Sequence, residues 1–197
     1  RRALDALGAK KIVLVTPYSQ AVTDHEAEFL NDAGYQVIYA KGYDLVIHDE
    51  CAAAADDAAQ VANVLKPHVD GTPGVALHCA MHSYRVVKDF ARPQAPGSPG
   101  ALWFDFLGLQ SSGHGPQSPI AITYVNQNHP ITRGFSNWTT INEELYNNVQ
   151  PPSAFPAHTS LATGRQTQTN KKDGTKKEAE AVVIWTNEFG PKKARVF

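Results

Sequence analysis

Two histidines stand at the ends of apolar runs in this chain. His48 closes the run 44–47, and His78 closes the run 74–77. His82 follows four residues after His78. An imidazole titrates at a pH of about 6.5, so it can take up and release protons under physiological conditions. The spacing therefore indicates an acid–base or ligand-binding site, if the two runs end at the same place in the fold.

A further histidine, His114, lies between Gly113 and Gly115. Flanking glycines let the backbone approach a ligand closely. With His78 and His82, this residue is a candidate ligand for a divalent metal such as zinc or manganese, which imidazoles bind. The spacing matches no standard metal motif, so histidine catalysis without a metal is the preferred interpretation.

Cys79 adds a candidate nucleophile beside His78. At a strand-to-helix turn, the helix N-terminus lowers the pKa of a thiol, whereas most cysteines without such a role are small buried residues. Cys51 has a weaker version of the same position, and Glu143 is interpreted as a solvated edge residue. The catalytic candidates are therefore His78, His82, His114 and Cys79. The candidates for substrate binding are His48, Glu50, Tyr84, Arg85, Glu144 and Tyr146.

The first half of the chain alternates apolar, β-branched runs with helical patterns. The predicted strands are 11–16, 36–39, 44–48 and 74–78, and the predicted helices are 21–33, 52–65 and 81–90. Thr23 or Asp24 is the expected cap of the first helix, and Pro67 is expected just past the end of the second. Continuous apolar strands that alternate with helices predict a flavodoxin-like, doubly wound parallel sheet that contains all four strands.

Ligands of such sheets bind beyond the carboxyl ends of the strands. The histidines that we expect to converge there in one pocket are His48, His78, His82 and His114. A later strand is expected to bring Glu144 or Tyr146 to the same place.

The second half of the chain is richer in strands and loops. A loop is expected at 92–100, and a short helix or turn at 103–107. The further strand candidates are 120–125, 145–149, 160–163, 181–186 and 194–197. The segment 171–177 contains the turn pair Asp173-Gly174 and is expected to be exposed and mobile. We therefore predict a single α/β domain over 1–197 with a β-rich C-terminal extension.

Composition excludes several classes of protein. The 197 residues carry a net charge of −1, which argues against nucleic-acid binding. No apolar run reaches the roughly 18 residues that a membrane-spanning helix needs. Two cysteines cannot build a disulfide scaffold. No signal peptide is expected at the start of the given chain, which leaves a cytoplasmic or periplasmic location open. Association into a homo-oligomer also stays open.

From about residue 42 onward, the sequence resembles the ThuA-like (trehalose utilisation) family. The segments that carry the resemblance are 44–51, 77–85, 103–108, 129–134, 143–146 and 195–197. The resemblance implies a fold like that of class I glutamine amidotransferases and a role in carbohydrate metabolism, on a glycoside or an oxidised sugar. It places His78 at the site. Cys79 stands where amidotransferases carry their nucleophile, but the flanking glycines of that motif are missing.

Residues 4–40 resemble something else, namely the second half of maleate isomerases in the Asp/Glu racemase superfamily. The catalytic cysteines of that superfamily do not fall in the matching stretch, so isomerase activity is not expected. The change of resemblance near 39–43 suggests a chimera in which residues 1–41 form a βαβ opening.

Three functions stay open on these grounds. The first is an enzyme, a hydrolase or lyase, that acts on a small-molecule sugar through the histidine-rich site. The second is a non-catalytic or engineered α/β scaffold or a sugar-binding module. The third is an amidotransferase-like hydrolase that uses Cys79.

Overall fold

A computed structural model describes residues 10–50, 52–169 and 173–197. The chain divides into two compact units, residues 1–47 and 48–197, and each is described by itself. Because every residue of the candidate site lies in the second unit, the account of the first is brief.

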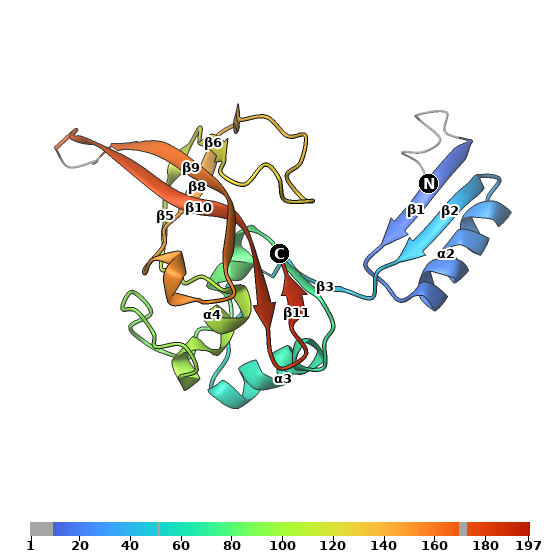
Figure 1. The fold of residues 1–197 in the computed structure, drawn as a ribbon, viewed down its shortest axis with the longest axis horizontal. Coiled ribbons are helices and arrows are strands. Elements are labelled where there is room, and N and C mark those ends of the chain that lie inside the picture. Colours follow the sequence, from blue (N-terminus) through green and yellow to red (C-terminus); the bar gives the residue numbers. More distant parts are fainter. Residues whose placement is uncertain (1–9, 51, 170–172) are drawn as a thin grey trace. The chain divides into compact units, whose positions relative to one another are not determined.

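The N-terminal unit pairs two strands in parallel beside one helix (Figure 1). Its elements are β1 (Lys11–Thr16), α2 (Gln20–Asp32) and β2 (Gln36–Gly42). The predicted strands and helix are confirmed, but the predicted cap is wrong, because Ser19 caps α2 by accepting a hydrogen bond from the backbone N–H of Val22. Thr23 instead lies buried inside the helix, where its hydroxyl bonds that of Thr16.

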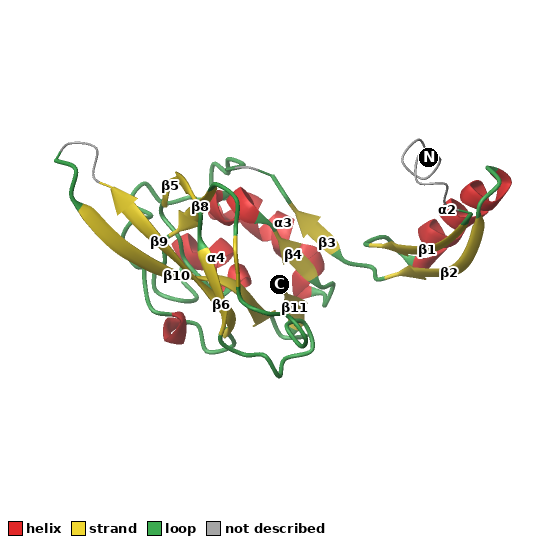
Figure 2. Ribbon diagram, turned by 90° about the horizontal axis from the view of Figure 1, so that it is seen from above, coloured by secondary structure: helices red, strands yellow, loops and turns green. Residues whose placement is uncertain are grey.

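The C-terminal unit is built of strands, helices and connecting loops (Figure 2). The strands are β3 (Val46–His48, which ends at the first residue of the unit), β4 (Gly74–Ala76), β5 (His114–Ser118), β6 (Ala121–Tyr124), β7 (Trp138–Thr139), β8 (Glu143–Tyr146), β9 (Thr159–Thr169), β10 (Lys176–Phe189) and β11 (Ala194–Val196). The α-helices are α3 (Ala58–Val69) and α4 (Leu102–Leu107). Short 3₁₀ helices span His78–His82, Pro99–Ala101 and Pro152–Ala154.

The main sheet is mixed rather than parallel throughout. Its seven strands run in the order β3-β4-β11-β10-β9-β6-β7, and β5 and β8 form a separate antiparallel pair. β11 pairs with β4 in parallel, but β10 is antiparallel to both β11 and β9. The α/β class is therefore confirmed, and the doubly wound arrangement is not. The hairpins of the second half join the same sheet as β4 instead of forming an extension to it.

The four strands predicted for one parallel sheet fall in two sheets. β1 and β2 pair with each other, whereas β3 and β4 belong to the seven-stranded sheet. β3 has only three residues, and the carbonyl of its last residue, His48, accepts a hydrogen bond from Leu77, just after β4. A local apolar pattern predicts which residues form a strand. Which sheet that strand joins depends on the strand with which it forms hydrogen bonds.

One predicted helix has different bounds from those expected, and another is absent. α3 begins at Ala58 because the Asp57 side chain caps it, and Pro67 lies inside its last turn. No helix spans 81–90, where the chain leaves the 3₁₀ turn at Ser83. The Ser83 hydroxyl bonds the backbone of Glu50, and Tyr84 adopts a left-handed φ of 52°, which ends helical geometry.

The C-terminal unit has an aromatic core. The α4 side chains of Trp103 and Phe106 are at most 1% exposed, and Trp103 donates from Nε1 to the carbonyl of Ala80. Asn187 of β10 donates to the carbonyls of Asp105 and Phe106, so it satisfies acceptors that the helix leaves open near its C-terminus. This core therefore fixes α4 between the 3₁₀ turn and the main sheet.

The hairpin of β9 and β10 extends beyond the strands that it pairs with (Figure 1). Residues 173–177 near its tip are exposed, as predicted for that part of 171–177, and residues 170–172 lie outside the described part of the chain. None of the helices in the described residues has the length and apolar character needed to cross a membrane.

We expect Phe106→Ala to lower the free energy of unfolding by about 3–5 kcal/mol, because the ring is fully buried and its removal leaves a cavity. Denaturant unfolding measures the change. Ile141→Ala is the control, since Ile141 is 85% exposed and its truncation is expected to cost about 0.5 kcal/mol or less. Similar losses in both variants would contradict this assignment of the core.

Candidate functional site

His78 occupies a strained turn directly after β4. Its backbone has a φ of 49°, in the left-handed region that non-glycine residues rarely adopt. Such strain costs about 1–3 kcal/mol and persists where the surrounding structure fixes it. Here the preceding residue, Leu77, donates its N–H to the carbonyl of His48. The turn thereby projects an imidazole beyond the end of the strand, where it is 48% exposed.

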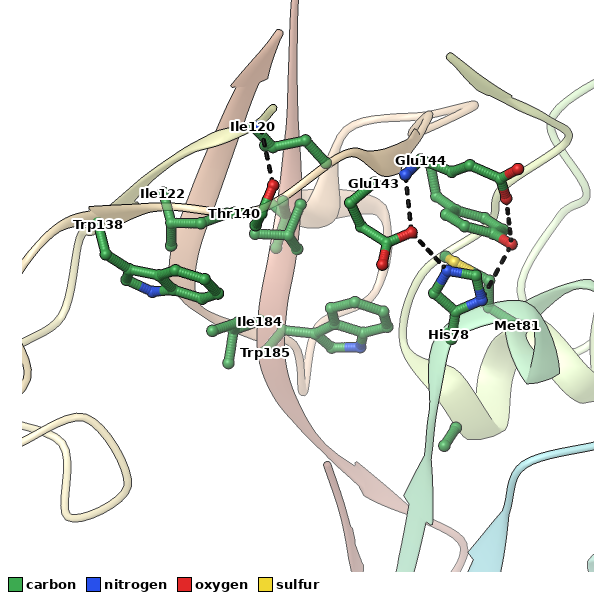
Figure 3. Close-up of a pocket in the computed structure, with 14 residues that line it drawn as sticks. His78, Met81, Ile120, Ile122, Trp138, Thr140, Glu143, Glu144, Ile184 and Trp185 are labelled. Carbon is green, nitrogen blue, oxygen red and sulfur yellow. Dashed lines mark hydrogen bonds and ion pairs between the residues drawn. The ribbon is translucent and has the colours of Figure 1, made fainter. Parts of the chain in front are cut away.

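Glu143 of β8 is the first partner of the His78 imidazole. Nε2 of His78 lies 3.0 Å from Oε1 of Glu143, which also accepts the backbone N–H of Glu144 at 2.8 Å (Figure 3). The bond from the Glu144 backbone, followed by the bond from His78, lowers the pKa of the Glu143 carboxyl. Glu143 is therefore an ionised acceptor, which holds the hydrogen on Nε2 and leaves Nδ1 with a lone pair when the ring is neutral. Glu143 is 42% exposed, as expected of a solvated edge residue, but the expectation missed its contact with His78 and its place on the cavity wall.

Tyr146 lies at the centre of three predicted histidines. Its ring centroid is 5.1 Å from that of His78, 4.7 Å from that of His82 and 5.3 Å from that of His114. Its hydroxyl lies 3.5 Å from Nδ1 of His78 and 3.4 Å from Oε2 of Glu144. The structure therefore places three of the four histidines around Tyr146, but of these only His78 lines the cavity, together with Glu144 and Tyr146 from the later strand.

His82 is held in a neutral, buried setting. Its Nε2 lies 2.9 Å from the hydroxyl of Ser111, which is fully buried and donates to Oδ1 of Asn147. Burial, with the nearby charge of Arg85 second, lowers the pKa of His82 to about 4. We conclude that His82 supports the site as a neutral hydrogen-bond donor rather than as a cation.

His114 approaches the site from the glycine-flanked segment. It stands opposite Tyr146 in the register of β5 and β8. Its Nδ1 donates to the carbonyl of Gly115 at 2.8 Å and lies 3.7 Å from Oε2 of Glu144. His114 is thus placed to orient the Glu144 carboxylate.

A cavity of about 270 Å³ opens beside this cluster (Figure 3). Its lining residues are Ala76, His78, Met81, Ile120, Ile122, Trp138, Thr140, Glu143, Glu144, Tyr146, Val182, Val183, Ile184 and Trp185. Trp185 is fixed by a 2.7 Å hydrogen bond from Nε1 to the carbonyl of Leu107. Sequence reasoning missed both tryptophans, because Trp138 lies on a two-residue strand and Trp185 on a strand whose pattern also suits core residues.

His48 does not join the cluster around Tyr146. Its two ring nitrogens each lie 3.0 Å from a partner, Nε2 from Nε2 of His68 and Nδ1 from Oε1 of Glu50. Tyr84 hydrogen-bonds Glu50, and burial together with this bond raises the pKa of the Tyr84 phenol to about 12. The substrate-binding role expected for these residues therefore has no support from their position.

Arg85 also lies outside the cavity lining. Its guanidinium carbon is 4.1 Å from the ring centroid of Phe90, and burial lowers the pKa of the guanidinium to about 10. Cys79 is half-buried and packs against the aromatic core, and it is not among the residues that line the cavity. Cys51 lies outside the described residues.

The metal hypothesis for His78, His82 and His114 does not fit the geometry. Within residues 10–50, 52–169 and 173–197, no three His, Cys, Asp or Glu side chains are grouped so that they could hold a metal ion. Nε2 of His82 is engaged with Ser111, and Nδ1 of His114 donates to the carbonyl of Gly115. We therefore assign no step to a metal.

The lowered pKa of His82 predicts a dependence of stability on pH. In the unfolded chain an imidazole titrates at about pH 6.5, so between about pH 6.5 and 4 the unfolded state binds the proton and the folded state does not. Stability therefore falls as the pH falls through this window. Denaturant unfolding over this pH range measures the slope, which His82→Gln is expected to reduce. Parallel curves for the two proteins would rule out this assignment.

Comparisons with known proteins identify the family. A solved structure of a ThuA-like protein from Bacteroides uniformis is 15% identical, with a TM-score of 0.47, and the alignment covers 95% of this chain and 80% of that one. No curated protein matches the chain. The family match begins at residue 10, so it includes most of the opening that resembles maleate isomerases, and the suggestion of a chimera stays a prediction. Because this match extends over residues 10–197, the chain belongs to the ThuA family, described as trehalose utilisation.

Proposed function

We propose that the protein is an enzyme that acts on a carbohydrate bound in the cavity, with His78 as the general acid–base. The observation that carries the proposal is the position of His78, which combines a strained turn, an ionised carboxylate partner and a place on the cavity wall. His78 also follows β4, a strand that pairs in parallel with β11. This agrees with the location of sites in flavodoxin-like sheets, beyond the ends of parallel strands.

The lining of the cavity suits a sugar ring. Trp138 and Trp185 offer broad apolar surfaces for the C–H faces of a sugar, and burial of such surface favours binding. Thr140 and Glu144 supply polar groups for hydroxyls at the same cavity. A few polar groups on a mostly apolar wall are the usual composition of a small-molecule site. The family's link to trehalose utilisation supports the same class of ligand.

The Glu143–His78 pair supplies the proton chemistry. With Nε2–H donated to Glu143, a neutral His78 can accept a substrate proton at Nδ1. The imidazolium that forms is then stabilised by the carboxylate 3.0 Å away, as in other carboxylate–histidine pairs. The proton can return from Nδ1 to a leaving oxygen or to a carbanion. The same pair therefore serves hydrolysis or elimination on a glycoside or an oxidised sugar.

The test is turnover of a panel of glucosides, trehalose and their oxidised forms by the purified chain. We expect His78→Gln to lower kcat by about 10²–10⁴-fold, the usual contribution of a general acid–base group. Glu143→Gln is expected to lower kcat as well, because the amide cannot stabilise the imidazolium. His25→Gln is the matched control, since His25 lies on the exposed face of α2.

Two results would overturn the enzyme proposal. Turnover that His78→Gln leaves unchanged would remove His78 from the chemistry. Binding of a sugar without turnover of any panel member would favour the sugar-binding module instead, and Trp185→Ala would then be expected to weaken binding.

A further inference from the structure

Two histidines that do not line the cavity, His48 and His68, form a buried pair. His48 is 5% exposed and His68 is fully buried. Their Nε2 atoms are 3.0 Å apart and their ring centroids 5.2 Å apart, so the two rings meet nitrogen to nitrogen. Trp103 and Phe106 cover the pair, with ring centroids 5.1 Å and 5.5 Å from that of His48. Water therefore has little access to the contact between the two nitrogens.

The contacts of this pair require one more proton than two neutral imidazoles carry. Nδ1 of His68 lies 2.7 Å from the carbonyl of Thr72, which only accepts, so this nitrogen bears a hydrogen. Nε2 of His68 then has a lone pair and accepts from Nε2–H of His48. Nδ1 of His48 faces Oε1 of Glu50 at 3.0 Å, and this contact needs a hydrogen too. The chain is complete when both nitrogens of His48 are protonated.

The neighbouring groups favour this assignment. Burial opposes ionisation of Glu50, but bonds from Tyr84 and His48 outweigh it, and the pKa of Glu50 is lowered. Glu50 is thus the anion that balances a charged His48. Burial lowers the pKa of His68, which keeps His68 as the neutral acceptor. Trp103 and Phe106 carry no charge, so among the described residues Glu50 and His68 are the titratable groups that His48 contacts, and Tyr84 bonds Glu50 in turn.

We propose that His48 and His68 form a proton-dependent positioning device for the turn that carries His78. The link is short, because the carbonyl of His48 accepts the N–H of Leu77 at 2.8 Å and Leu77 precedes His78. When His48 takes up a proton, the chain from Thr72 to Glu50 is complete. When His48 releases that proton to solvent, either the bond to His68 or the bond to Glu50 is lost. The hydrogen bond from Leu77 to the His48 carbonyl changes as a consequence. The device rests on the proposed role of His78.

The experiment is an NMR titration of the full chain from about pH 5 to pH 8, across the usual range of imidazoles. Side-chain ¹⁵N shifts of His48 report its two nitrogens, and the amide of Leu77 reports the turn. We expect the chemical shifts of the His48 nitrogens and of the Leu77 amide to change with pH at one common inflection. The chemical shifts of the His78 ring are expected to change at the same pH. In His48→Gln the pH-dependent shift of the Leu77 amide is lost, whereas His25→Gln keeps it.

A pair of variants at His68 separates positioning from packing. The amide of His68→Gln keeps a donor for Thr72 and an acceptor for His48, so the Leu77 inflection is retained. His68→Leu fills the space but removes the acceptor, so the inflection is lost. Equal behaviour of the two variants would overturn the device.

The variant His78→Gln separates the device from the proposed function. The Leu77 inflection is expected to persist in it, because His48 is intact. If the inflection disappears with His78, or if Leu77 is insensitive to pH in the unmodified protein, the device is wrong. If turnover is unchanged in His78→Gln while the inflection persists, the proposed function is wrong and the proton-dependent turn stands. The spectra of the unmodified protein decide the case even if His48→Gln does not fold.

Discussion

The hydrogen bond between His78 and Glu143 joins two parts of the chain that are 65 residues apart, and the candidate site exists only where those parts meet. β8 has four residues and pairs with β5 alone, so it needs support from the main sheet. Gln166 of β9 supplies it, because its buried Nε2 lies 3.0 Å from each of the carbonyls of Pro116, Ser118 and Glu143, which share its two hydrogens. A single side chain thus attaches both strands of the small sheet to the large one.

The other half of the contact depends on the aromatic core. His78 sits on a turn whose next residues pack into that core, and Trp103 bonds the carbonyl of Ala80 within the turn. Gly108 ends α4 with a φ of 73°, and a Cβ there would meet Asn187 at 2.5 Å. The close approach of β10 to the end of α4 therefore requires glycine. Packing at this point fixes the strained backbone on which His78 is displayed.

Local sequence patterns predicted the features that depend on neighbouring residues in the chain, namely the strands and the positions of the histidines along it. Apolar runs located most strands, and the placement of His78, His82 and His114 at strand ends or in a glycine-rich segment predicted their approach to one another. Other partners that are distant in sequence escaped prediction. Glu143 has no local sign that it faces His78.

The pairing of His48 escaped prediction for a related reason. The sequence pattern predicts a helix over 52–65 with Pro67 past its end, which leaves His68 outside the helix. The helix continues to Val69, with Pro67 in its last turn. His68 therefore lies on the helix, and its Nε2 is 3.0 Å from Nε2 of His48. Proline has no N–H to donate and its ring crowds the carbonyl four residues earlier, which is why the pattern predicted that the helix ends before Pro67.

The histidines of this fold differ in role because they differ in environment. His82 is buried beside Arg85, and its pKa of about 4 keeps it neutral, so it can hold Ser111 but cannot exchange protons usefully near neutral pH. His78 is half-exposed, borders a cavity and has an ionised carboxylate on one nitrogen, while the other nitrogen lies 3.5 Å from the Tyr146 hydroxyl. His48 has the carboxylate but no access to a substrate. Unlike His48, His78 combines an anionic partner with a place on the cavity wall, and acid–base chemistry on a bound substrate requires both.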